Sequence, residues 1–198
     1  MIAFKNLHQE IPYLIFKEKY KNAINAGQNN IEAMAISSFN IKKNEVDSRF
    51  VNLKLIDGNK FIFFSNYNSP KSIAFNSHKQ ISALFYWSST NVQIRMKAKI
   101  NKTSSQFNSQ YFKERSIDKN ALAISSNQSE IIDSFDEVTS RYKQTFETKD
   151  LSQCPSYWGG FLFIPYSFEF WQGHESRLNK REVYEKTNDS WKHFILQP

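Results

Sequence analysis

Short apolar segments separated by turn-forming or charged residues recur along most of the chain, and this pattern constrains the fold more than any other feature. Such segments, rich in Ile, Val, Phe and Tyr, are typical of β-strands, and tight turns between them favour antiparallel pairing. The pair Asp57-Gly58 favours a two-residue hairpin. We predict strands over residues 33–39, 50–56, 60–65, 81–87, 92–101, 161–166, 168–172, 181–185 and 191–196, with the turn Thr187-Asn188-Asp189 between the last two.

Helices are predicted where apolar residues recur every three to four positions or where capping residues stand together. Pro12 and Pro70, the latter after Ser69, lie at helix starts, where a missing N–H costs little. Thr103 and Gln106 form a capping box. The predicted helices cover residues 11–27, 70–77, 103–115 and 129–146. Many strands and few helices indicate a mainly β fold of the α+β class, a barrel with peripheral helices.

The length of 198 residues allows one domain with a substantial core, because 40% of the residues are hydrophobic and 18 are Phe. No repeat, low-complexity segment or linker interrupts the sequence, so we predict a single domain over residues 1–198. No apolar run reaches the roughly 20 residues of a membrane-spanning helix, and residues 1–10 lack the apolar stretch of a signal peptide. Cys154 is the only cysteine, so no disulfide forms within the chain. We therefore expect a cytoplasmic protein without a membrane partner.

The formal net charge of +7 favours anionic ligands, among which nucleic acid is one candidate. The cations are scattered, however, and the densest group, Arg177-Leu-Asn-Lys-Arg181, is too short for a basic arm. A phosphorylated small molecule explains local groups of cations equally well. We therefore do not expect a nucleic-acid partner.

Standard catalytic and metal-binding motifs are absent from the sequence. It has neither a GxGxxG nor a GxxxxGK[ST] loop, no serine nucleophile elbow, and four histidines without metal-ligand spacing. These absences favour either chemistry carried by an organic cofactor or binding alone, and we expect no metal site.

Cations and polar residues gather instead at the ends of predicted strands and helices. Arg49 and Lys54 lie five positions apart on one predicted strand and therefore point to opposite faces. Lys71 with Ser65 stands at one predicted helix start, and Gln128-Ser129 opens the long predicted helix. Because helix N-termini and fixed cations bind phosphate groups, these patches indicate phosphate recognition.

The order of these elements resembles the pyridoxamine 5′-phosphate oxidase family. The resemblance rests on Phe168-Glu-Phe-Trp-Gln-Gly173, on Arg177-Leu-Asn-Lys-Arg181 with Tyr184 and Trp191, and on Ser156-Tyr-Trp-Gly-Gly-Phe161. It extends upstream through Arg49 and Lys54, Ser65-Asn66 with Lys71, Trp87 with Gln93, Tyr111 with Arg115, and Gln128-Ser129, and covers the chain from about residue 12 to Pro198. Each element alone is weak, whereas the ordered set is specific.

The resemblance implies an FMN-binding split β-barrel that forms a homodimer with FMN at the subunit interface. It also implies an oxidoreductase, a flavoprotein of pyridoxine biosynthesis, with a phosphorylated B6 vitamer and O2 as its partners. Such an enzyme oxidises pyridoxine or pyridoxamine 5′-phosphate to pyridoxal 5′-phosphate and reduces O2 to H2O2. Hydride transfer is the chemistry of the flavin, so the protein needs to supply only orientation and charge.

The resemblance also implies roles for individual residues. The expected phosphate and ribityl ligands of FMN are Arg49, Lys71, Gln128 and Ser129; the residues expected around its ring system are Phe64, Ser65, Gln93, Trp171 and Arg181. The expected ligands of the substrate phosphate are Lys54, which is also counted among the FMN-binding residues, Tyr111, Arg115 and Lys119. Arg177 is expected to lie over the substrate ring and, with Asn179, to act in catalysis.

Four features depart from the family pattern. Asn179 replaces the histidine of the usual Arg-Leu-His triplet, and asparagine forms hydrogen bonds but carries no charge. Pro70 replaces an arginine beside the FMN-phosphate lysine, and Lys119 stands where a serine usually helps to bind the substrate phosphate. The N-terminal segment that forms a substrate lid in relatives is expected to be missing, because about eleven residues precede the first helix.

These departures leave two alternatives open. One is an FMN-dependent oxidoreductase of the same fold that acts on another substrate, such as a different aromatic ring. The other is a flavin- or pyridoxal phosphate-binding protein without turnover. Because the departures affect the substrate side more than the FMN side, the sequence predicts FMN binding but leaves the substrate open.

Overall fold

The computed structural model describes residues 1–188 and 190–198, and its strands form one sheet of ten strands. The strands are β1 (Ala3–Lys5), β2 (Ala33–Asn40), β3 (Glu45–Asn52), β4 (Leu55–Asp57), β5 (Lys60–Asn66), β6 (Gln80–Trp87), β7 (Val92–Lys102), β8 (Trp158–Gln172), β9 (Lys180–Thr187) and β10 (Ser190–Leu196). The helices are α1 (Ile11–Asn25), α2 (Pro70–Ser77), α3 (Ser105–Glu114), α4 (Ile117–Ser125) and α5 (Phe135–Thr148), with a short 3-10 helix at Ser88–Thr90.

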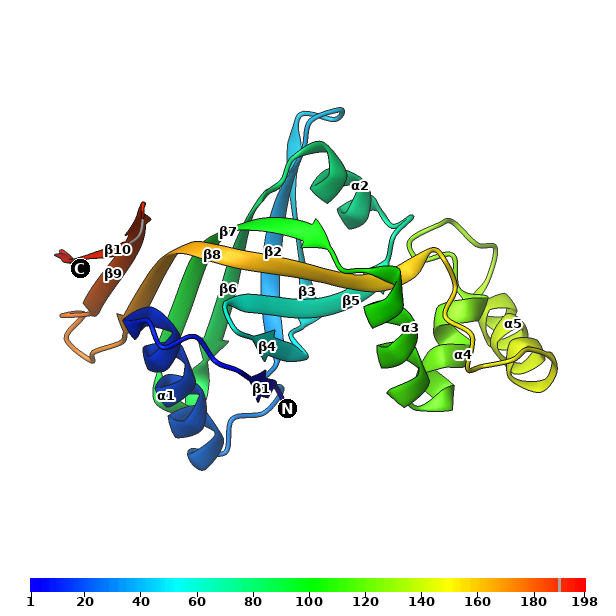
Figure 1. Cartoon of the computed structure of the whole chain (residues 1–198), viewed down its shortest axis with the longest axis horizontal. Helices are drawn as coiled ribbons and strands as arrows, with labels where there is room; N and C mark the ends of the chain where they lie inside the picture. The colour runs from blue at the N-terminus through cyan, green and yellow to red at the C-terminus, as the bar shows by residue number, and fades with distance from the viewer. Residues whose placement is uncertain (189) are drawn as a thin grey trace.

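The sheet curls into a barrel that is open on one side. Its strand order is β1-β4-β5-β8-β7-β6-β2-β3, with the β9–β10 hairpin branching from β8, and β3 contacts β5 across the barrel. Figure 1 shows α1 near the β9–β10 end of the molecule and α3, α4 and α5 at the opposite end. The expected mainly β barrel with peripheral helices is confirmed. One sheet joins all the described strands, which agrees with a single domain over residues 1–198, and that expectation stays a prediction.

Strand β8 explains why the barrel is split. It pairs antiparallel with β7 from Phe161 to Gln172, but on its other side the first half pairs with β5 and the last half pairs with β9. The change of neighbour occurs at a β-bulge, where Pro165 and Ser167 pair with consecutive residues of β7 and Tyr166 is left over. The strands predicted over 161–166 and 168–172 are therefore one continuous strand.

Aromatic side chains fill the barrel and attach α1 to it. Phe16 of α1 meets Phe61 at 5.2 Å and Trp87 at 5.7 Å between ring centroids, both edge to face. Phe61 stacks on Phe163 of β8 at 5.3 Å. All four rings are almost completely buried, which accounts for the high Phe content, because large rings bury the most apolar area per residue.

The strand predicted over residues 50–56 is wrong. The strand begins earlier, at Glu45, and the chain breaks at Leu53 and Lys54 before β4. At the break the backbone changes partners, since the N–H of Leu53 donates to Glu32 and that of Lys54 donates to Ile62. Lys54 thus lies between two strands and not on the face opposite Arg49. The expected hairpin at Asp57-Gly58 is confirmed, with Gly58 at a positive φ of 59°.

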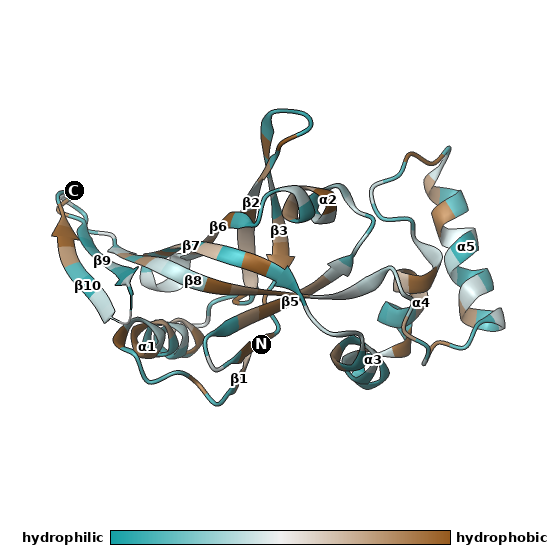
Figure 2. Cartoon of the chain, turned by 45° about the horizontal axis from the view of Figure 1, so that its top comes forward, coloured by the Kyte–Doolittle hydropathy of each residue, from teal (hydrophilic) through white to brown (hydrophobic). Residues whose placement is uncertain are grey.

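The helix predicted over residues 129–146 is also wrong at its start. Ser129 has a left-handed backbone, with φ at 72°, and α5 begins at Phe135 behind the N-cap Ser134. The prediction missed α4 entirely. Helix α5 buries only Thr145 and lies beyond α4, away from the sheet (Figures 1 and 2), so its apolar periodicity does not reflect packing on the barrel.

The other predicted helices agree with the structure apart from their ends. Helix α2 starts at Pro70 as expected, but α3 is capped by Ser104, whose hydroxyl accepts the N–H of Phe107. Thr103 instead bonds to Asn108 and to the carbonyl of Gly160, because it belongs to the contact between α3 and β8. In the predicted turn at 187–189, Asp189 lies outside the described residues. No helix in the described chain is long and apolar enough to cross a membrane.

Candidate active site

An open cavity of about 570 Å³ lies between the barrel and the helices α3 and α4. The strands β3 and β5, the break at Lys54, and the N-terminal end of α2 form its barrel side. Eight of the residues expected from the sequence line it: Lys54, Phe64, Ser65, Lys71, Tyr111, Arg115, Lys119 and Gln128. The structure therefore gathers most of the expected phosphate-binding and flavin-facing residues in one place.

One end of the cavity carries a buried cation at the start of α2. The Nζ of Lys71 lies 3.2 Å from the hydroxyls of Ser65 and Ser69, and no carboxylate of a described residue lies within 4 Å of it. Burial, and then the nearby charge of Arg49, lower the pKa of Lys71 from 10.5 to about 8. A buried ammonium beside a second cation is unfavourable unless an anion joins them, so this end suits a phosphate group.

Two residues lie near Lys71: Gln128, which lines the cavity, and Arg49, which lies outside the lining but is close enough to act on the charge of Lys71. Gln128 accepts hydrogen bonds from the Ser65 hydroxyl at 3.2 Å and from the Asn66 N–H at 3.3 Å. Arg49 donates to the Ser38 hydroxyl at 2.7 Å and lies 3.6 Å from Asp47. The contacts of Gln128 hold the loop after α4 against the end of β5. Gln128 does not open a helix, because α5 begins only at Phe135.

Parallel aromatic rings form the wall of the cavity. Phe64 lies 3.8 Å from Tyr111 and 5.1 Å from Trp158 between ring centroids, with interplanar angles of 15° and 6°. The guanidinium of Arg115 lies 4.4 Å from the ring of Trp158. Flat rings and a stacked guanidinium provide a surface that matches a planar aromatic ligand.

A second group of cations consists of Arg115 and Lys119 on the α3–α4 side and Lys54 at the strand break. Arg115 donates through Nη2 to the carbonyl of Lys119 at 3.4 Å, while its Nη1 is buried without a partner. Burial lowers the pKa of Arg115. Lys119 and Lys54 line the same cavity, and Lys54 lies 3.3 Å from Glu32. Because a buried donor without an acceptor costs about 1–3 kcal/mol, this group is also suited to an anion.

Three expected residues lie outside the cavity, in one row of the sheet. Gln93 of β7, Trp171 of β8 and Arg181 of β9 are direct cross-strand partners. Trp171 and Trp158 stand at opposite ends of β8, which separates the row from the cavity by roughly 40 Å at about 3.3 Å per residue. One chain therefore does not bring the row and the cavity around the same small ligand.

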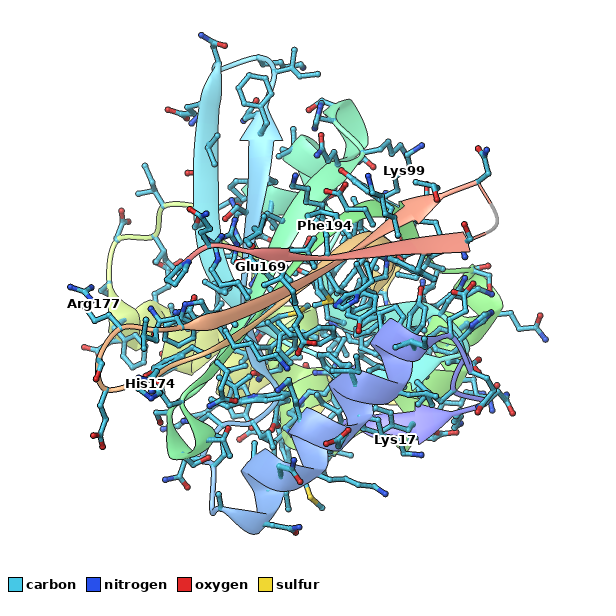
Figure 3. The ribbon with its side chains drawn as sticks, turned by 90° about the vertical axis from the view of Figure 1, so that its left-hand side faces the viewer. Lys17, Lys99, Glu169, His174, Arg177 and Phe194 are labelled. Carbon is cyan, nitrogen blue, oxygen red and sulfur yellow. The ribbon has the colours of Figure 1, made fainter. Side chains whose placement is uncertain are left out.

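Arg177 and Asn179 belong to the loop between β8 and β9, next to this row. Arg177 is exposed, and Figure 3 shows it pointing away from the body of the molecule. Its backbone is left-handed, with φ at 61°, and its N–H donates to the carbonyl of His174 at 2.9 Å. The Oδ1 of Asn179 accepts the N–H of His174 at 3.1 Å. Asn179 thus closes the loop that carries Arg177.

The structure does not place Ser129 in the cavity. Its backbone turns left-handed after Gln128, and it lines a small separate depression with Ile131 and Arg141. The sequence prediction also missed cavity residues, among them Phe50, Glu114 and Trp158. For Trp158 a signal was present, since Gly159 and Gly160 follow it, and a Cβ at Gly159 would lie 2.2 Å from the Tyr67 hydroxyl.

Curated relatives match almost the whole chain, and a family profile matches its C-terminal part. The pyridoxine/pyridoxamine 5′-phosphate oxidase of Christiangramia forsetii is 35% identical over 191 residues, covering 94% of this chain and 88% of the relative. The enzymes of the same name from Nostoc sp. and Coxiella burnetii are each 34% identical, over 94% and 92% of this chain and 88% and 93% of theirs. Residues 158–198 match the pyridoxine 5′-phosphate oxidase C-terminal dimerisation region.

Solved structures share the fold. PhzG from Burkholderia lata, in complex with tetrahydrophenazine-1-carboxylic acid, superposes with a TM-score of 0.89 at 24% identity, covering 94% of this chain and 92% of that one. A pyridoxamine 5′-phosphate oxidase-related, FMN-binding protein from Nostoc punctiforme superposes with a TM-score of 0.75 at 14% identity, covering 92% and 97%. Both confirm the split β-barrel.

The barrel with its cation-lined cavity places the chain in the split β-barrel class of proteins. At more than 30% identity over nearly its whole length, the chain belongs to the pyridoxine/pyridoxamine 5′-phosphate oxidase family. The expected family and enzyme class are confirmed, whereas the roles of individual residues stay predictions.

Proposed function

We propose that the protein is an FMN-dependent oxidase that converts pyridoxine or pyridoxamine 5′-phosphate to pyridoxal 5′-phosphate and reduces O2 to H2O2. The observation that carries this proposal is the cavity itself, which is lined by two groups of cations and by an aromatic wall. Two phosphate-bearing molecules, cofactor and substrate, require two such groups.

The FMN phosphate is assigned to the end of the cavity at Lys71. Arg49 and Lys71 supply charge, while Ser65 and Gln128 supply hydrogen bonds to the phosphate or the ribityl chain. Bound FMN would supply the chemistry, since its ring accepts a hydride and passes the electrons to O2. Pro70 removes one cation relative to the family, and the burial of Lys71 supports this lysine as the main charge of the site.

The substrate phosphate is assigned to the second group of cations, Arg115, Lys119 and Lys54. Arg115 has an unpaired Nη1, and Lys54 and Lys119 line the same cavity. Tyr111 of the aromatic wall adds a hydroxyl. Lys119, which replaces the serine of the family pattern, keeps this group suitable for a dianion.

A complete site requires a second copy of the chain. We assign Gln93, Trp171, Arg181 and Arg177 to the cavity of the partner in a homodimer. The separation of roughly 40 Å along β8 supports this arrangement, as does the match to a dimerisation region over residues 158–198.

Titration of the apoprotein with FMN and a peroxide assay test the proposal. We expect flavin absorbance to be retained, and H2O2 to form with at least one phosphorylated vitamer. Lys71→Ala should weaken FMN binding about tenfold or more, because it removes a charge-assisted contact. Arg177→Ala should lower kcat/KM about 100-fold through lost orientation, with FMN binding unchanged. Failure to bind FMN, or the reverse pattern in the two variants, would contradict the assignment.

A second candidate function is oxidation of a different anionic aromatic substrate by the same flavin site. It is favoured by Asn179, because its Oδ1 is already used by His174 and is not free for a substrate. A panel of phosphorylated and carboxylated ring compounds, followed by flavin bleaching without O2, separates the two functions. Retained FMN with no bleaching by any compound would instead indicate a binding protein without turnover.

A further inference from the structure

We propose that Glu169 is a positioning residue, which fixes the guanidinium of Arg181 in the orientation that recognises the flavin ring. The proposal rests on the proposed function, since it assumes that Arg181 contacts FMN. Glu169 itself touches neither cofactor nor substrate in this assignment, and acts through its contact with Arg181.

Glu169 is a buried carboxylate between two arginines. Its side chain is only 10% exposed, and it lies on the central strand β8 between Arg95 of β7 and Arg181 of β9. Its Oε1 accepts the Nε–H of Arg181 at 2.9 Å, and its Oε2 lies 3.3 Å from Nη1 of Arg95. Figure 3 labels Glu169 beside the strands of the C-terminal hairpin.

Arg181 is held at two of its three nitrogens. Its Nε donates to Glu169, and its Nη1 donates to the carbonyl of Gln197 at 3.1 Å. Among the described residues, no acceptor binds Nη2, so this edge is free for a ligand. Because guanidinium is planar, fixing two nitrogens fixes the direction of the third. Trp171 and Gln93, two further residues expected at the ring, lie in the same row.

A carboxylate is required at this position for a chemical reason. Both neighbours are donors only, and an ionised carboxylate is an acceptor at both oxygens. An amide of the same shape would turn its NH2 group toward one arginine and leave that contact without an acceptor. A buried ion pair gives little net stability over apolar residues, so stability alone does not explain the charge.

Glu169→Gln tests the proposal in the full-length protein, with the FMN dissociation constant measured by quenching of flavin fluorescence. We expect the constant to rise about tenfold, in line with loss of a charged hydrogen bond. In Arg181→Ala the same substitution should add no further weakening, because the two residues act as one unit. Glu182→Gln, a matched carboxylate that pairs with Lys180 on β9, should leave FMN affinity within about twofold.

Arg95→Ala and the midpoint potential of bound FMN distinguish positioning from a purely electrostatic or structural role. Arg95 is 53% exposed, and its removal should leave FMN affinity nearly unchanged. If Glu169→Gln displaces the guanidinium from the ring, the potential should fall, since the reduced flavin loses a nearby positive charge. If Glu169 only weakens the field of a fixed Arg181, the potential should rise, and the proposal is overturned.

Glu169→Asp is the second variant if Glu169→Gln does not fold. It keeps the charge but shortens the side chain by one methylene, so FMN binding should again weaken. If the wild type binds no FMN, the proposed function fails and this proposal fails with it. If the wild type binds FMN and Arg181→Ala weakens binding while neither Glu169 variant does, only the role of Glu169 is overturned.

Discussion

At the scale of a single residue, the position of Lys71 in the sequence explains its burial, and its burial bears on its proposed role in phosphate binding. It follows Pro70 at the start of α2, where the chain turns inward and buries the ammonium beside Ser65 and Ser69. Its pKa of about 8 lies below the ordinary 10.5. Between these values the unfolded chain holds more protons than the folded one, so the stability of the apoprotein rises with pH across this window. A bound anion would remove that penalty by stabilising the charged form.

FMN affinity should therefore depend on pH. Binding of a phosphate requires protonated Lys71, so the dissociation constant should rise about tenfold between pH 7 and pH 9, as expected for a group with a pKa near 8. Fluorescence titrations at a series of pH values measure this. Lys71→Arg is the control, because arginine keeps its charge throughout this range and should flatten the profile. An unchanged profile in the variant would show that another group titrates.

Asn179 shows why a residue type alone does not define a role. It was expected in catalysis because it occupies the position of a family histidine, but its carbonyl oxygen closes the loop at His174. That loop holds Arg177 in a left-handed conformation, which a non-glycine residue adopts only when its surroundings fix it. The structure thus supports a role for Asn179 in placing Arg177, and its part in catalysis stays a prediction.

At the scale of elements, the side chain of Glu10 connects helix α1 to the hairpin formed by β9 and β10. It stands at the N-cap of α1 and accepts hydrogen bonds from Lys186 of β9 and, at 2.7 Å, from Trp191 of β10. Burial alone would raise the pKa of Glu10, but these hydrogen bonds outweigh it and lower the pKa below 4.5. The stability that Glu10 contributes is therefore fully present above pH 4.5 and is lost as the pH falls through the folded value.

Glu10→Gln should lower the free energy of unfolding at pH 7 by about 1 kcal/mol, the usual value of a partly exposed charged hydrogen bond. The difference from the wild type should shrink as the pH falls below 4.5. Urea unfolding at pH 7 and at acid pH measures both effects. Glu18→Gln, an exposed substitution on the same helix, serves as the control and should change little. An equal loss at both pH values would mean that packing, and not charge, dominates.

At the scale of the whole molecule, β8 separates two halves of a candidate site. Its first residue, Trp158, lines the cavity, and near its other end Trp171 pairs with Arg181 of β9. In a homodimer, the cavity of each chain would face the row of Gln93, Trp171 and Arg181 of the other chain. Such a dimer would have two equal sites, as closed twofold symmetry requires.

Mixing two defective variants tests this arrangement. Lys71→Ala damages the cavity and Arg181→Ala damages the row, so each homodimer should have weak activity. Because a heterodimer joins an intact cavity to an intact row at one of its two sites, refolding an equal mixture should restore about a quarter of wild-type activity at random pairing. Each variant refolded alone is the control. No gain on mixing would place both residues in the same chain's site.

Local patterns in the sequence determined most of the strands, the start of α2, the hairpin at Gly58 and, through ordered motifs, the family. These features depend on neighbours along the chain, such as side-chain alternation, a proline at a helix start and a glycine at positive φ.

The tertiary structure alone decided which residues meet. It breaks the predicted strand at Lys54, excludes Ser129 from the cavity, places Lys119 and Lys54 in the lining of one cavity, and pairs Glu169 with Arg181. Each of these depends on backbone hydrogen bonds and burial between segments far apart in the sequence. Local periodicity carries no information about such partners, because the same alternation fits any neighbouring strand.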